Sequence, residues 1–218
     1  MNQIKYDKAK ELIQEGDILL FRGSGIIGAL IKRYTGGVHS HVALAHKDGD
    51  ILECVEFREF IGGRSVALKS QVDNAPLSID VFRPVKSISY EEMDKYGKVT
   101  LIEKKYTKET ASAMTEDIIR WTGQPYGWKN IWMMLLRFIP GARLFQQNIN
   151  DDEVAKAKVC STAVTVALRR NYMDPVPYLA DDRVSPAGLK KLIKSQYALY
   201  NYPVWHQVLR ACKQVRQE

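Results

Sequence analysis

The feature that most constrains the fold of this chain is a turn between two apolar runs. Residues 38–45 and 51–57 are rich in β-forming side chains, and the turn-forming sequence Lys47-Asp48-Gly49-Asp50 separates them. This pattern predicts an antiparallel β-hairpin. A strand-length apolar run at residues 17–22 precedes the hairpin, and Pro84 closes the β-rich part of the sequence.

Most of the predicted strands precede a long region of helical pattern. Two further strands are expected at about residues 65–70 and 78–83, and helical spacing of apolar residues dominates from Pro84 to about residue 195. Strands first and helices afterwards indicate an α+β fold. The predicted helices lie at residues 5–15, 26–34, from the capping box Ser89-Tyr90-Glu91-Glu92 onward, 111–121, 160–170 and 186–195, and a last strand is predicted at 197–208.

The chain has 218 residues and a net charge of +7, with an isoelectric point near 9.2. A basic surface can attract nucleic acid, anionic membranes or acidic polymers, so charge alone does not choose a partner. The basic residues are scattered in doublets such as Lys104-Lys105, and no nucleic-acid-binding motif occurs. We therefore expect no nucleic-acid partner.

The cysteines and the first residues bear on the compartment. Cys54, Cys160 and Cys212 are too few for a disulfide framework and are odd in number, and no C-x-x-C motif indicates zinc. Residues 1–15 lack the apolar segment of a secretory signal peptide. A cytoplasmic location is expected from the sequence as encoded, with delivery to the cell envelope or carriage in a virion left open.

Cys160 is the candidate nucleophile because it lies where a helix is predicted to begin. The positive end of the helix dipole and the unpaired N–H groups of a first turn favour a thiolate at such a place. Cysteine catalysis also needs an imidazole within hydrogen-bond reach and a polar group that orients it. His41 begins a predicted strand, and Glu53 lies roughly across the hairpin from it. These residues predict a Cys160, His41 and Glu53 triad.

Other residues compete for two of these places. His39 and His46 lie close to His41 in the sequence, and Glu56 is a second acid on the strand that carries Glu53. Cys54 and Cys212 are interpreted as small apolar side chains of the core, which is the usual role of an isolated cysteine.

Five sequence blocks follow one another along the chain. They are Gly16-Asp17-Ile18-Leu19-Leu20-Phe21, His39-Ser40-His41-Val42-Ala43-Leu44, Leu52-Glu53-Cys54-Val55, Gly123-Gln124-Pro125-Tyr126-Gly127 and Val159-Cys160-Ser161-Thr162-Ala163-Val164. In this order they resemble the blocks of the circularly permuted papain-like hydrolases, and are most similar to the YiiX/YaeF-like branch of the NlpC-type superfamily. An ordinary papain-like enzyme has its cysteine helix before its histidine strand, whereas the order here is histidine, acid and cysteine, as in the permuted branch.

The resemblance implies a fold and roles for three residues. The fold would be a single permuted papain-like domain over residues 1–218, with a helical insertion at about 85–150. Cys160 would be the nucleophile, His41 the general base and then the general acid, and Glu53 the third member of the triad.

The resemblance also implies an activity. Tyr126 and Ser161 would lie where substrate or the oxyanion binds, although the family more often has an acidic or polar residue at the position of Gly127. Acyl transfer through the cysteine needs no metal and no cofactor. The implied enzyme is a cysteine amidase or peptidase that acts on peptides or peptidoglycan fragments.

One segment favours a different substrate. Residues 128–145 combine an apolar run with Lys129, Arg137 and Arg143, and are too short for a transmembrane span. A helix of this kind either packs in the core or contacts a membrane surface. Membrane contact would favour a lipid-directed acyltransferase or thioesterase similar to the lecithin:retinol acyltransferase relatives. A third alternative is a binding or virion-associated protein that keeps the fold without turnover.

Overall fold

The computed structural model describes residues 3–23, 26–74, 78–84, 88–93, 96–128, 158–171, 173, 184–189 and 205–211. Within these residues the strands form a seven-stranded sheet, in the order β1-β9-β6-β2-β3-β4-β5, and a separate two-stranded hairpin. The neighbours in the large sheet are antiparallel except β1 and β9, which are parallel. The strands of the large sheet are β1 (Gln3–Ile4), β2 (Ile18–Phe21), β3 (His41–Asp48), β4 (Ile51–Arg58), β5 (Gly62–Ala67), β6 (Ile79–Pro84) and β9 (Trp205–Ala211).

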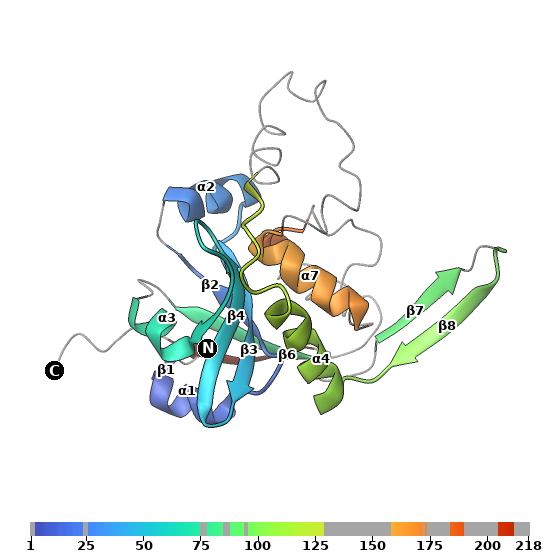
Figure 1. Ribbon diagram of the computed structural model, residues 1–218, viewed down its shortest axis with the longest axis horizontal. Helices are drawn as coiled ribbons and strands as arrows, with labels where there is room; N and C mark the ends of the chain where they lie inside the picture. The colour runs from blue at the N-terminus through green and yellow to red at the C-terminus, as the bar shows by residue number, and fades with distance from the viewer. Residues whose placement is uncertain are drawn as a thin grey trace, which may run out of the picture.

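Helices cover both faces of this sheet (Figure 1). Val42 and Leu44 of β3 belong to one buried cluster, which also contains side chains of α4 and α7. The alternate residues Ala43 and Ala45 belong to a second cluster, with side chains of α1 and α3. This alternation is the two-residue period of a strand, with both faces buried. The helices are α1 (Tyr6–Leu12), α2 (Ile26–Thr35), α3 (Leu68–Asn74), α4 (Lys108–Ile119) and α7 (Cys160–Arg170).

The α+β class predicted from the sequence is confirmed by this arrangement. The predicted hairpin is also present, with Asp48 paired to Ile51 and only Gly49 and Asp50 between the strands. Gly49 has a positive φ of 58°, which a glycine adopts without steric cost. No helix in the described part of the chain is long and apolar enough to cross a membrane.

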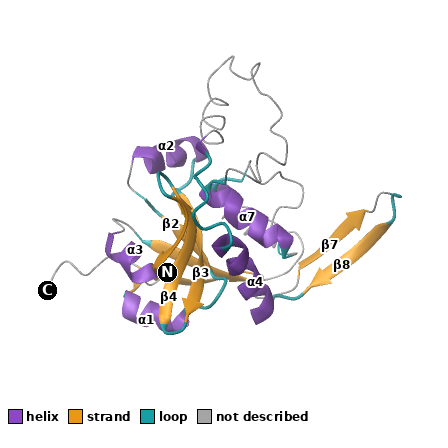
Figure 2. Cartoon of the chain, in the orientation of Figure 1, coloured by secondary structure: helices purple, strands orange, loops and turns teal. Residues whose placement is uncertain are grey.

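The predicted helix that starts at the Ser89-Tyr90-Glu91-Glu92 capping box is wrong. These residues lie in β7 (Ile88–Met93), which pairs with β8 (Val99–Lys104) as a hairpin that projects away from the sheet (Figure 2). Gly97, with a φ of 79°, provides the left-handed turn residue between the strands. A capping signal is local, and the β-forming partner strand outweighs it.

Other predicted elements differ in extent, among them the last strand, which is β9 at Trp205–Ala211 instead of 197–208. The strand expected at 65–70 ends at Ala67, and the residues that follow form α3. The helix expected at 186–195 is helical at 186–189, and its remainder lies outside the described residues. Most of the helical insertion expected at 85–150 is either the β7–β8 hairpin or outside the described residues, so α4 is its described helical part.

Candidate active site

Cys160 is the first residue of α7, at the helix start that the sequence predicts. The preceding residue, Val159, is extended and provides no side-chain cap for the first turn. The thiol is buried, and the helix behind it is buried as far as Leu168. The sulfur therefore occupies a fixed position at the positive end of a helix dipole.

His41 is the first residue of β3 and is held between two elements. Its backbone pairs with Phe21 of β2, and the two aromatic rings lie with their centroids 5.3 Å apart. The buried ring donates a hydrogen bond from Nε2 to Oε2 of Glu56. Nδ1 is buried, and no described residue lies in hydrogen-bond geometry with it. Nδ1 is therefore the nitrogen available to a second group.

The second group near the His41 ring is Cys160. Burial alone would lower the pKa of His41, but negative charge on Glu56 and then on Cys160 raises that pKa to about 10. The imidazole is therefore protonated at neutral pH. A protonated ring next to a sulfur favours negative charge on that sulfur.

Glu56 is fully buried on β4 and links two cations. Oε2 accepts from His41, and Oε1 accepts from Nε of Arg64 at 2.8 Å and from its terminal nitrogen at 2.5 Å. Burial would raise the pKa of Glu56, but His41 and Arg64 lower it to about 2. The carboxylate is therefore charged, and its two oxygens fix its orientation.

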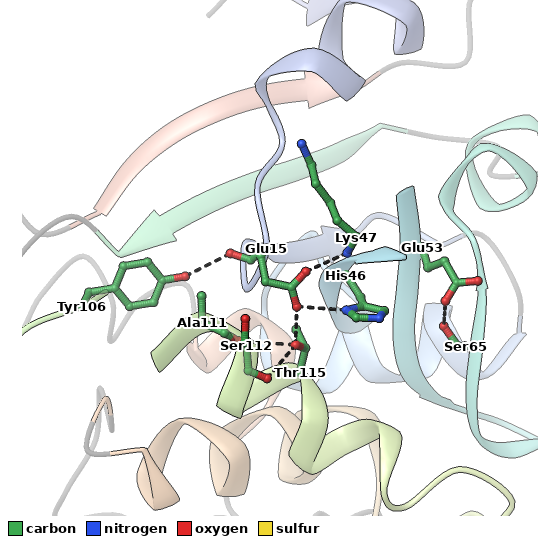
Figure 3. Close-up of polar contacts among 9 residues, drawn as sticks. All are labelled: Glu15, His46, Lys47, Glu53, Ser65, Tyr106, Ala111, Ser112 and Thr115. Atoms are coloured by element: carbon green, nitrogen blue, oxygen red, sulfur yellow. Dashed lines mark hydrogen bonds and ion pairs between the residues drawn. The ribbon is translucent and has the colours of Figure 1, made fainter. Parts of the chain in front are cut away.

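The predicted third residue, Glu53, does not contact His41. Glu53 pairs across the hairpin with His46, and its carboxylate accepts a hydrogen bond from the hydroxyl of Ser65 (Figure 3). Since His46 is five residues from His41 on one strand, the two side chains point to opposite faces of the sheet. Glu56 is three residues from Glu53, an odd number, and so lies on the face of His41. The acid at the His41 ring is thus Glu56, the alternative that the sequence left open.

The two competing histidines bind other acids. The ring of His46 contacts Oε1 of Glu15 at 3.0 Å, and that oxygen also accepts from the hydroxyl of Thr115 (Figure 3). The buried ring of His39 contacts Oδ2 of Asp80 at 2.8 Å. Neither contact involves Cys160, so of the three candidates His41 is the one beside the thiol.

Tyr126 approaches the same thiol from a loop before the region outside the described residues. Burial is the main cause that raises its pKa, and negative charge on Cys160 and on Glu59 raises it further. The phenolic oxygen is buried, and no described side chain or backbone group lies in hydrogen-bond geometry with it. The structure thus places Tyr126 near Cys160, where the sequence predicts it.

Backbone hydrogen bonds tie the Tyr126 loop to the rest of the site. The N–H of Gly63 donates to the carbonyl of Gln124 at 2.9 Å, and the N–H of Gly123 donates to the carbonyl of Gly63 at 2.8 Å. At the other end, the N–H of Gly127 donates to the carbonyl of Lys158 at 3.0 Å. The loop therefore bridges β5 and the residues that lead into Cys160.

The remaining predicted residues have plainer surroundings. Ser161 is buried in the first turn of α7, and its carbonyl accepts from the Thr165 hydroxyl at 2.8 Å. Cys54 is a buried free thiol, and burial raises its pKa well above the ordinary value. Cys212 and all of segment 128–145 except Trp128 lie outside the described residues. Across the described ranges, no group of three or more acidic, histidine or cysteine side chains is placed to hold a metal ion.

Comparisons with known proteins give a distant structural likeness. No protein-family model matches this sequence. No curated protein matches it either. The chain has a structural neighbour of the YiiX type. It is similar to the crystal structure of the metalloprotein YiiX from Escherichia coli O157:H7 (DUF1105), with 15% sequence identity over 93% of this chain and 90% of that chain, and a TM-score of 0.48. A likeness this weak does not assign an activity or a metal to this chain.

Proposed function

We propose that this protein is a cysteine hydrolase that acts by acyl transfer, with Cys160 as nucleophile, His41 as acid and base, and Glu56 as the orienting acid. The observation that supports this most is the buried succession of contacts from the thiol through the imidazole and the carboxylate to Arg64. Because Glu56 occupies Nε2, Nδ1 is the nitrogen that exchanges protons with the sulfur. This is the arrangement that nucleophilic cysteine catalysis needs.

In the first step the Cys160 thiolate attacks the carbonyl carbon of the substrate, and a sulfur–carbon bond forms. The carbonyl oxygen becomes an oxyanion, which N–H groups at the start of α7 stabilise; Tyr126 is a second donor at the same place. When the bond to the leaving group breaks, the leaving nitrogen, oxygen or sulfur takes the proton from Nδ1 of His41. The products of this step are the acyl-enzyme, a neutral imidazole and the free leaving group.

In the second step a water molecule attacks the acyl-enzyme while neutral His41 accepts its proton. The sulfur–carbon bond breaks, a carboxylic acid is released, and the thiolate and imidazolium are restored. Glu56 keeps one tautomer and orientation of the ring through both steps, and its charge is already balanced by Arg64. No oxidant, reductant or metal enters the balance.

Amide bonds of cell-wall peptides are the substrates we propose first. The support is the order of the five sequence blocks, which is that of the permuted papain-like hydrolases. The same order supports the permuted form of the fold, with the histidine strand before the cysteine helix. Peptidoglycan fragments are therefore the first substrates to test.

Selective labelling tests the proposed nucleophile. At mildly acidic pH, iodoacetamide should modify Cys160 faster than Cys54, which is the control thiol because it is buried and free but not at a helix start. Peptide mapping by mass spectrometry gives both rates. Release of new amino groups from peptidoglycan fragments should be lost in Cys160→Ala and in His41→Ala, with circular dichroism unchanged. Full activity in either variant would refute the mechanism.

A further inference from the structure

The turn between β4 and β5 carries an exposed aromatic side chain beside the proposed site. Phe60 is 82% exposed, and its ring contacts that of Trp128 with the centroids 4.7 Å apart. The ring of Trp128 lies edge-on to that of Tyr126, at 5.3 Å. Tyr126 and Cys160 belong to one buried cluster. Aromatic contacts therefore continue from an exposed phenyl ring to the residue next to the nucleophile.

Folding gives no reason for a phenylalanine at this position. Among the described residues, Phe60 alone combines a side chain with a positive φ, of 66°. A non-glycine residue in such a conformation costs about 1–3 kcal/mol, and an exposed ring recovers little of that cost by burial. Asparagine and glycine adopt this backbone more readily. Strain of this kind, together with an exposed apolar side chain beside a reactive group, points to a role in binding.

The turn is also rigidly placed. Gly62 has a φ of 92°, and a Cβ there would lie only 2.1 Å from the carbonyl oxygen of Gln124. The backbone of the turn thus packs directly on the Tyr126 loop, and the two hydrogen bonds of Gly63 hold it there. Phe60 keeps its position relative to the site because it is attached to this docked backbone.

We propose that Phe60 and Trp128 form a subsite for an apolar group next to the reacting carbonyl of the substrate. The inference rests on the proposed function of Cys160. An acyl chain and an aromatic or aliphatic amino-acid side chain share the required chemistry, because each covers the open face of the Phe60 ring. A carboxylate at this position would lose hydration against the ring. Covering about half of a phenyl ring increases affinity about tenfold.

Thioesters with one leaving group test this proposal and distinguish the two sources of an apolar group. The series consists of the acetyl, hexanoyl, N-acetylphenylalanyl and N-acetylglutamyl thioesters of N-acetylcysteamine. The released thiol is measured in quenched samples. We expect kcat/KM for hexanoyl or N-acetylphenylalanyl to exceed that for acetyl about tenfold, and N-acetylglutamyl to gain nothing. The better of the two apolar arms identifies an acyl chain or a side chain.

Phe60→Asn should reduce the ratio of apolar to acetyl kcat/KM to about one. Because asparagine tolerates a positive φ, its thermal midpoint should equal or exceed that of the native chain. Tyr96→Asn is the matched control, since Tyr96 is also 82% exposed but lies on the β7–β8 turn. This control should leave the ratio unchanged.

The outcomes separate the two proposals. If the native protein turns over no thioester faster than Cys160→Ala, the proposed function and the subsite are both wrong. If Cys160-dependent turnover is present but shows no apolar preference, or if the preference survives in Phe60→Asn, only the subsite is wrong. A lower thermal midpoint in Phe60→Asn would assign the ring to packing and would also overturn the subsite.

Discussion

Replacing Glu56 by glutamine removes the charge that keeps the His41 ring protonated. The side chain keeps its size, but Nε2 of the ring then faces a neutral amide. Burial, which alone lowers the pKa of His41, is no longer outweighed by Glu56. We expect the pKa of His41 to fall well below about 10, because only the charge on Cys160 then opposes the effect of burial.

The size of the effect follows from the pKa of His41. A rise from 6.5 to about 10 corresponds to about 5 kcal/mol in favour of the protonated ring in the folded protein. Since the folded pKa is above the unfolded one, this stability is fully present below pH 6.5 and is lost as the pH rises through 10. Glu56→Gln lacks the part of that contribution that comes from Glu56. Its rate of acyl transfer should fall by about 100-fold or more, because a correctly protonated acid–base group contributes at least that much.

Two measurements check this prediction. Urea denaturation from pH 5.5 to pH 10 gives the free energy of unfolding, and NMR of labelled imidazole rings gives the His41 titration directly. The control is Glu53→Gln, which makes the same chemical change on the same strand but on the opposite face, where Ser65 is the partner. The control should leave the titration of His41 and the rate unchanged. A midpoint for His41 that is the same in Glu56→Gln and the native protein would refute the assignment of Glu56.

Other substitutions test the surroundings of the site. Arg64→Met leaves Glu56 with one cation, so we expect the free energy of unfolding to fall by about 2–3 kcal/mol in urea titrations. The rate of acyl transfer should fall less than in Glu56→Gln. Arg64→Lys should recover part of both losses. Gly62→Ala forces its Cβ against the Gln124 carbonyl, so thermal denaturation should show a loss of about 2 kcal/mol or more, and an unchanged midpoint would contradict the docked turn. Thr107→Ala removes the N-cap of α4 and should cost about 1 kcal/mol in the same assay.

Sequence reasoning was most successful where a local signal and the tertiary structure agree. The hairpin at the Gly49 turn and the helix from Cys160 to Arg170 both lie where apolar runs and turn residues predict them. The capping box at Ser89 shows the opposite case, because pairing with β8 determines the strand there. A local cap contributes about 1 kcal/mol, which a complete hairpin register outweighs.

Which acid contacts His41 depends on the register of the hairpin, and the amino-acid composition does not determine that register. Shifting a hairpin register by one residue exchanges the two faces of a strand, so the choice between Glu53 and Glu56 depended on the exact turn. The observed loop consists of Gly49 and Asp50, which pairs Glu53 with His46. Predicting the position of Arg64 also requires the register of β4 and β5, because Arg64 pairs with Glu56 across that turn. The exact residues of the two turns are the sequence signal that would have identified Glu56 and Arg64.

Charge balance explains why a carboxylate this deeply buried is compatible with folding. A lone buried charge is strongly unfavourable, whereas Glu56 has a cation on each oxygen. Two cations and one anion leave a net positive charge, which in the proposed mechanism a thiolate at Cys160 would neutralise. Arg64 already neutralises part of the Glu56 charge. The positive charge of His41 is therefore not fully compensated by that carboxylate and can interact with the Cys160 sulfur. In the proposed mechanism, the charges that the fold tolerates in its core are the ones that prepare Cys160 for attack.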